Sequence, residues 1–275
     1  MNYGIVKVDM APLFATADKN TARVDEVLFG MGVEVLRAEG EWRYVRTLWQ
    51  AEGYVWGTHL YEEASGAREW DSLGKMAARA QYVDVLSAPG ADGAVLAGVP
   101  RGGLVRPLGD ADASGYVQVE LPGGGTGYAK SGNLMPQLTQ GKAVEARPMR
   151  EALATSALSY LGTQYRKGGR TPFGIDDEGL VGMALLLNGF VLPRGSRGAL
   201  TAPLRKLPKE ELAMGDILYF EKQMAMYLGD GSYIHATDLD GSDGVVINSI
   251  APASPFYRAD LAESLVLCAS LFGEG

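Results

Sequence analysis

The chain contains little cysteine and little histidine. Its 275 residues include one cysteine, Cys268, and two histidines, His59 and His235. A single cysteine excludes an internal disulfide and a metal site built from several thiolates. Cys268 lies in the apolar stretch LVLCASLF, which favours a buried, small apolar side chain over a reactive thiol. No metal and no other cofactor is predicted.

Long apolar segments and basic clusters are missing as well. No apolar run reaches the length of a membrane-spanning helix, so no membrane span is expected. The net charge is −8 and no run of Lys or Arg stands out, which argues against nucleic acid as a partner. The first residues, MNYGIVKVDMAPLF, lack the pattern of a signal peptide. A cytoplasmic location is therefore expected for the sequence as it stands, and the cell envelope if a leader precedes it.

Glycine and β-forming residues are abundant in the first half of the chain. Residues 1–64 and 80–136 show short β-forming stretches between Gly, Pro and Asp breaks, and residues 65–79 are predicted to form a linker or a short helix. The two β stretches have matching positions. The intervals from Trp42 to Gly53-Tyr54 and Leu60 equal those from Tyr116 to Gly127-Tyr128 and Leu134. One supersecondary unit used twice accounts for this agreement.

The second half has a different pattern. After a polar linker at 137–146, residues 147–275 are predicted to form an α+β domain. Leu153, Ala157, Leu158 and Leu161 recur at helical spacing, and β-forming stretches follow from residue 215 onward. Gly-Asp-Gly at 229–231 indicates a hairpin turn between two of these strands.

The most informative stretch runs from Tyr165 to Gly195. A loop containing glycine and proline leads into three acids, Asp176, Asp177 and Glu178, and an apolar run follows. Acids followed by apolar residues are typical of the start of a buried helix, because the first N–H groups lack partners and the helix dipole is positive there. We therefore predict a central helix over about 177–188, which ends at Asn188-Gly189.

This stretch resembles the signature of the NlpC/P60 cysteine peptidases, papain-like enzymes that cut bacterial cell-wall peptides. That signature is close to Tyr-x-x-Gly-Gly-x-x-Pro-x-Gly-Ile-Asp-Cys-Ser-Gly-Leu-Val. Ten positions match: Tyr165, Gly168, Gly169, Pro172, Gly174, Ile175, Asp176, Gly179, Leu180 and Val181. The two β stretches resemble the bacterial SH3 domains, small β-barrels that often precede such domains. The resemblance thus implies two SH3-like barrels followed by a papain-like α+β domain.

The chain departs from the family pattern where the chemistry takes place. The family's nucleophilic Cys corresponds to Asp177, and its Ser to Glu178. The family's His falls on Gln223, whereas the third polar residue is kept as His235. Tyr165 matches a tyrosine that the family is thought to use near the oxyanion site. An amide side chain cannot act as a general base near neutral pH, and a peptidase of this type also needs its thiolate. We therefore expect no cysteine peptidase activity.

Several residues have two interpretations. Asp176 or Asp177 caps the helix and Glu178 faces solvent, or Asp176 and Glu178 form an anionic pocket that holds the ammonium group of a peptide fragment. Tyr54 and Trp56 form either an aromatic wall facing the cleft or part of the barrel core. His59 is interpreted as a residue at the barrel edge rather than a ligand.

Three functions remain open on sequence grounds. The first is a non-catalytic relative that binds peptidoglycan-derived peptides, of the L-Ala-γ-D-Glu-diamino acid type, or a protein partner. The second is a hydrolase in which the crowded acids Asp177 and Glu178 activate a water molecule. The third is an interaction protein that acts through its SH3-like barrels.

Overall fold

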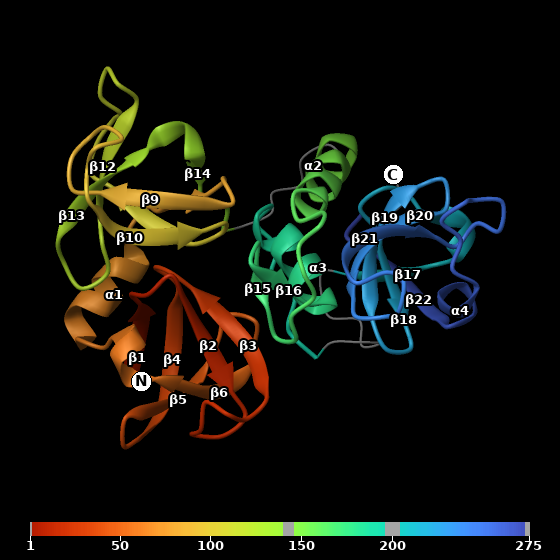
Figure 1. Ribbon diagram of the computed structural model, residues 1–275, viewed down its shortest axis with the longest axis horizontal. Coiled ribbons are helices and arrows are strands. Elements are labelled where there is room, and N and C mark those ends of the chain that lie inside the picture. The colour runs from red at the N-terminus through yellow and green to blue at the C-terminus, as the bar shows by residue number, and fades with distance from the viewer. Residues whose placement is uncertain (1, 140–145, 196–203, 273–275) are drawn as a thin grey trace. The chain divides into compact units, whose positions relative to one another are not determined.

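The structure is a computed structural model that describes residues 2–139, 146–195 and 204–272. It consists of two compact units, Met1–Gln137 and Leu138–Gly275, and each is described by itself. Figure 1 shows the first unit in red to yellow-green, with strands dominating, and the second in green to blue, with helices before most of its strands.

The first unit begins with a seven-stranded sheet of order β3-β2-β6-β5-β4-β1-β7, in which every pairing is antiparallel. Its strands are β1 (Asn2–Val6), β2 (Met10–Phe14), β3 (Arg23–Leu28), β4 (Gly32–Glu39), β5 (Trp42–Arg46), β6 (Glu52–Trp56) and β7 (Leu60–Tyr61). Side chains of a strand point alternately to its two faces. In β6, Gly53 and Val55 are buried, so this face of the strand lies on the core.

A second seven-stranded sheet repeats the first, with order β10-β9-β13-β12-β11-β8-β14. Its strands are β8 (Met76–Ala78), β9 (Tyr82–Leu86), β10 (Val95–Pro100), β11 (Leu104–Pro107), β12 (Tyr116–Glu120), β13 (Thr126–Lys130) and β14 (Leu134–Pro136). Each strand of the second sheet occupies the place of the strand numbered seven lower in the first sheet. A 3-10 turn precedes the last strand in both sheets, as η1 (Gly57–His59) and η2 (Ser131–Asn133). The duplication predicted from the residue intervals is confirmed.

The two sheets are joined by α1 (Ala64–Ser72) and by direct contacts. The helix lies within the predicted linker 65–79 apart from its first residue, but β8 already begins at Met76 and belongs to the second sheet. Phe29 of the first half packs into the apolar cluster of the second, and its carbonyl accepts a hydrogen bond of 2.7 Å from the N–H of Leu104. Both halves therefore share one compact unit.

The second unit contains a six-stranded antiparallel sheet of order β17-β22-β18-β19-β20-β21. Its helices are α2 (Ala146–Leu158), α3 (Asp177–Leu186) and α4 (Ala259–Glu263), with the turn η3 (Lys209–Glu211). Its strands are β15 (Arg170–Thr171), β16 (Gly174–Ile175), β17 (Arg205–Leu207), β18 (Ile217–Phe220), β19 (Met224–Gly229), β20 (Ser232–Thr237), β21 (Gly244–Ser249) and β22 (Leu265–Ser270). The predicted order of helices before a sheet is confirmed.

Helix α3 is the central helix that the sequence predicts. Its residues from Asp177 to Leu185 are buried apart from Glu178, because the segment is apolar on all sides and packs on α2, β19 and β20. Gly189 follows the helix in a left-handed conformation, with φ of 87°. This arrangement holds the start of α3 beside the sheet, as Figure 1 shows.

Candidate functional site

Asp176 caps the start of α3. Its Oδ1 accepts a hydrogen bond of 2.7 Å from the N–H of Gly179, and its Oδ2 accepts one of 2.7 Å from the N–H of Gly168. The glycine at 179 is required by close approach, since a Cβ there would lie 2.1 Å from the carbonyl oxygen of Gly169. The capping interpretation is therefore confirmed for Asp176, which ties the signature loop to the helix.

Arg194 forms ion pairs with both Asp176 and Glu178. Its guanidinium forms an ion pair with Asp176, and its Nε lies 3.7 Å from Glu178 Oε2. Glu178 also accepts a hydrogen bond of 2.9 Å from the N–H of Gly195. The side chains of Arg194 and Glu178 are only 11% and 12% exposed. A guanidinium thus occupies the place where the anionic-pocket hypothesis put a ligand ammonium, and the expectation that Glu178 faces solvent is wrong.

Asp177 is the first residue of α3 and is 2% exposed. Its Oδ2 accepts a hydrogen bond of 3.0 Å from the N–H of Met224, the first residue of β19. This bond brings the start of the helix next to Gln223, which directly precedes the strand. Two of the positions that the family resemblance singles out, 177 and 223, therefore lie at one place in the fold.

Gln223 and His235 form a buried polar network with Asn248. The ring of His235 on β20 is fully buried, with Gln223 Oε1 at 3.0 Å from Nδ1 and Asn248 Oδ1 at 2.9 Å from Nε2. Burial lowers the pKa of His235 to about 4, and the nearby Arg258 also lowers it, whereas the bond to Asn248 raises it. The imidazole is therefore neutral at pH 7.

A neutral imidazole has one N–H and one lone pair, so one of the two amides must present its NH₂ group to the ring. The NH₂ group of Asn248 is 3.5 Å from the carbonyl oxygen of Phe256, and the hydroxyl of Ser242 faces Asn248 Oδ1. Asn248 Oδ1 therefore accepts from Nε2–H of His235. The amide of Gln223 is then turned by 180° from the orientation given above, so that its NH₂ group donates to Nδ1 and its carbonyl oxygen lies on the other side.

The buried histidine predicts a pH-dependent stability. The unfolded chain has a histidine pKa near 6.5, above the value of about 4 in the folded state. Between these values the unfolded state binds more protons, so the free energy of unfolding falls as the pH falls, by roughly 3 kcal/mol in total. Urea denaturation of the second unit across this window measures the effect.

The chain offers a matched control for this prediction. His235→Gln should flatten the pH dependence of the second unit. His59→Gln, in the first unit, should leave that dependence unchanged. A dependence that persists in His235→Gln would assign it to other groups.

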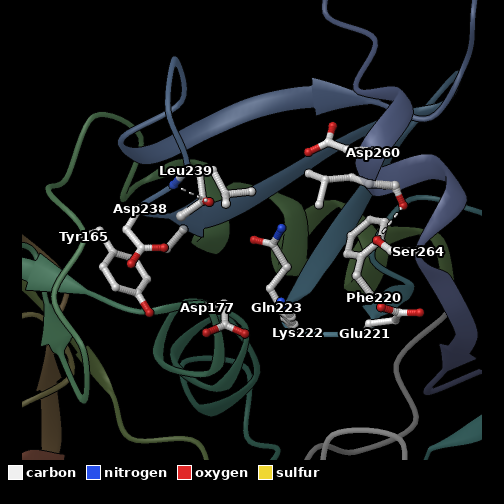
Figure 2. Close-up of a pocket in the computed structure, with 13 residues that line it drawn as sticks. Tyr165, Asp177, Phe220, Glu221, Lys222, Gln223, Asp238, Leu239, Asp260 and Ser264 are labelled. Carbon is white, nitrogen blue, oxygen red and sulfur yellow. Dashed lines mark hydrogen bonds between the residues drawn. The ribbon is translucent and has the colours of Figure 1, made fainter.

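A cavity of about 320 Å³ opens beside Asp177 (Figure 2). Its walls come from the signature loop, the start of α3, the β18–β19 turn, the end of β20 and helix α4. The lining residues are Tyr165, Asp177, Phe220, Glu221, Lys222, Gln223, Ala236, Thr237, Asp238, Leu239, Asp260, Leu261 and Ser264. Asp176, Glu178 and His235 are not among them, although His235 contacts the lining residue Gln223.

Cys268 does not replace the missing nucleophile. It is 5% exposed on β22 and packs with Leu218 and Phe220 in an apolar cluster, and burial raises the pKa of its thiol. Strand β22 is three strands away from β20, which carries His235. Neighbouring strands lie ~4.8 Å apart, so the two residues are separated by about 14 Å across the sheet. The prediction of a buried, structural cysteine is confirmed.

Tyr54 and Trp56 belong to the first unit and lie outside its core. They alternate along β6 with the buried Gly53 and Val55, so both rings are on the opposite face. Trp56 pairs with Trp42 at 4.9 Å between ring centroids, and Tyr54 pairs with Tyr44 at the same distance. The interpretation as core residues is therefore wrong, and an aromatic surface on β5 and β6 remains.

His59 lies in the 3-10 turn before β7 and is half-buried. Burial lowers the pKa of its imidazole. In the part of the chain that the structure describes, no group of three or more His, Cys, Asp or Glu side chains has the arrangement to hold a metal ion. Over the same residues, no helix is both long and apolar enough to cross a membrane.

Sequence reasoning missed Asn248, Arg194 and the contribution of residues 237–239 and α4 to the cavity. Asn248 is a polar residue that follows the apolar run Val245–Ile247 in strand β21, which is a weak signal for a buried hydrogen-bonding partner. Arg194 follows Leu-Pro, and its role depends on a fold that brings it back to Asp176. Helix α4 comes from the end of the chain, so nothing local indicates its place at the site.

Comparison with known proteins matches residues 162–258 to the model of the NlpC/P60 family. Dipeptidyl-peptidase 6 from Lysinibacillus sphaericus is 34% identical over 272 residues, which cover 98% of this chain and 99% of that protein. Gamma-DL-glutamyl hydrolase from Bacillus subtilis is 33% identical over 131 residues, 44% of this chain and 31% of that protein. A crystal structure of an NlpC/P60 family protein from Bacillus cereus has a TM-score of 0.81 at 18% identity, covering 97% of this chain and 98% of that one.

Proposed function

This chain belongs to the NlpC/P60 family, and we propose that it is a member that binds peptidoglycan-derived peptides without hydrolysing them. The ligands that we propose contain the L-Ala-γ-D-Glu-diamino acid sequence. One observation carries the proposal: a cavity opens beside Asp177, while residues 177 and 223 provide neither the thiol nor the imidazole of a cysteine peptidase.

The chemistry of the site supports the absence of peptide hydrolysis. A cysteine peptidase forms an acyl intermediate on sulfur, with a histidine that takes up the thiol proton. Asp177 carries no thiol, and Gln223 takes up no proton near neutral pH. His235 cannot replace the missing base, because both of its ring nitrogens are engaged by the amides of Gln223 and Asn248.

The alternative of a water-activating carboxylate pair has little support from the contacts. Glu178 lies outside the cavity lining, with its carboxylate on Arg194 and on the N–H of Gly195. A pair of acids that activates water shares a proton or a water molecule between two facing carboxylates. Glu178 therefore does not share the cavity with Asp177, as such a pair requires.

The names of the relatives support the class of ligand. The relative that matches along almost the whole chain is named a dipeptidyl-peptidase, and a second is named a gamma-DL-glutamyl hydrolase. The first name indicates a peptide substrate, and the second indicates a glutamyl bond of the γ type. We further propose that the two seven-stranded sheets of the first unit are SH3-like barrels, as their duplicated order and matching aromatic positions suggest.

Calorimetry with L-Ala-γ-D-Glu-diaminopimelate tests the proposal. The full chain should bind this tripeptide, and chromatography of the same mixture should show it intact. Leu239→Arg, at the cavity, should weaken binding by about tenfold or more through steric block. Leu239 is 37% exposed, and Leu158, which does not line the cavity, is 39% exposed, so Leu158→Arg is a matched control.

Two results would contradict the proposal. One is the absence of heat at millimolar tripeptide. The other is hydrolysis by the native chain that disappears in Asp177→Asn, since this would assign a catalytic role to the carboxylate.

A further inference from the structure

Acidic side chains outnumber basic ones in the lining of the cavity. Four of its lining residues are acids, Asp177, Glu221, Asp238 and Asp260, and among the described residues that line it Lys222 is the only basic one. Asp260 is neutralised by Arg258, whose Nη2 lies 2.8 Å from its carboxylate. The remaining balance is negative, which favours a cationic ligand.

Gln223 adds a neutral acceptor to this wall. The side chain is nine-tenths buried, and Figure 2 shows its amide standing among the residues that surround the cavity. One terminal atom of the amide contacts His235, and the other makes no hydrogen bond to any residue that the structure describes. Because the neutral His235 receives the NH₂ group of Gln223, the atom left for a ligand is the carbonyl oxygen.

We propose that the site selects a free primary ammonium, which is seated against the carboxylate of Asp177 and donates to the carbonyl oxygen of Gln223. This inference rests on the proposed function and narrows its ligand. An ammonium group has three donors and a positive charge, and it therefore satisfies a carboxylate and an amide oxygen together. A neutral amide N–H provides one donor and no charge.

The position of Asp177 indicates which ligand would carry this ammonium group. In the family resemblance, residue 177 occupies the place of the nucleophile, where the γ-glutamyl amide of an intact peptide would lie. Hydrolysis of that amide leaves the diamino-acid fragment with a protonated α-amine in place of the neutral amide nitrogen. A carboxylate at this place therefore prefers the fragment over the intact peptide. The reaction class that must supply the ligand is γ-D-glutamyl peptide hydrolysis by another enzyme.

Asp177 is the acid best placed to discriminate. It is 2% exposed, whereas Glu221 and Asp238 are exposed. An ion pair is stronger where water is excluded, and a charge-assisted hydrogen bond adds to it. The start of α3 also favours a negative charge at residue 177.

Two matched probes test the inference on the full chain: L-Lys-D-Ala and its Nα-acetyl derivative. They differ only in the α-amine, since both keep the ε-amine of the lysine. Isothermal titration calorimetry at neutral pH should show the free dipeptide binding about tenfold tighter than the acetylated one. This comparison uses the native chain and does not depend on any variant folding.

Asp177→Asn, which keeps the shape and removes the charge, should abolish the preference. Glu221→Gln removes the same charge from an exposed position of the same cavity and should keep it. Equal affinities of the native chain for both probes, with the tripeptide still bound, would overturn the ammonium inference and leave the proposed function standing. Absence of binding for the tripeptide and both dipeptides would overturn both.

Discussion

The double variant Asp177→Cys/Gln223→His is expected to hydrolyse L-Ala-γ-D-Glu-diaminopimelate, where the native chain leaves it intact. The surroundings of both positions are kept. The start of α3 is capped by Asp176, and a helix N-terminus lowers the pKa of a thiol. His235 lies 3.0 Å from the side chain of residue 223 and can orient an imidazole there. Because loss of a nucleophile costs on the order of a millionfold, even partial recovery gives about a thousandfold increase over background.

Each single variant is a control for the double variant. Asp177→Cys supplies a thiol without a base, and Gln223→His supplies a base without a nucleophile. Both should remain far below the double variant in product formation measured by chromatography. The introduced thiol can be followed with iodoacetamide, since Cys268, the other thiol of the chain, is buried and has a raised pKa. A double variant that binds the tripeptide and reacts with iodoacetamide, yet forms no product, would show that the site lacks more than these two groups.

Local patterns were sufficient to predict the elements that position the site. The acids before an apolar run indicated α3, and Gly-Asp-Gly at 229–231 indicated the turn between β19 and β20, where Asp230 has φ of 49°. Equal residue intervals indicated the duplicated sheets. These features depend on backbone propensity and on helix capping, which act within a few residues.

The pairing of distant segments was not predictable in the same way. Strand β22, near the end of the chain, is inserted between β17 and β18. Its sequence LVLCAS is a short apolar run, and such a run is compatible with either a strand or a buried helix segment. Its place in the sheet is decided by packing against neighbours far away in the sequence. The local pattern around Cys268 therefore predicts a buried residue but no strand.

The three acids illustrate the same limit within the site. Their position predicted a helix start, and the structure has one. Their separate roles depend on partners that lie elsewhere in the chain: Arg194 for Asp176 and Glu178, and Met224 for Asp177. Only Asp177 is left on the cavity, so the amine-binding hypothesis moves from the pair Asp176 and Glu178 to a residue that the resemblance had marked for loss of catalysis.

Asp176→Ala is expected to destabilise the second unit by about 3 kcal/mol, because it removes the carboxylate that pairs with a largely buried guanidinium, whose contact with Glu178 is longer. The carboxylate is 3% exposed and accepts from two backbone N–H groups as well as pairing with Arg194. Loss of the cap alone would cost ~1 kcal/mol. Urea denaturation that follows the second unit measures the total.

The double variant Asp176→Ala/Arg194→Leu separates these two contributions. If loss of the ion pair dominates, removal of Arg194 together with Asp176 should restore part of the lost stability, because no buried guanidinium then lacks the carboxylate of Asp176. Glu178 keeps its hydrogen bond from the N–H of Gly195 in this double variant. If the loss of stability in the double variant equals the sum of the losses in Asp176→Ala and Arg194→Leu, the carboxylate acts mainly through the backbone of Gly168 and Gly179. The ion pair would then be a consequence of the loop geometry rather than its cause.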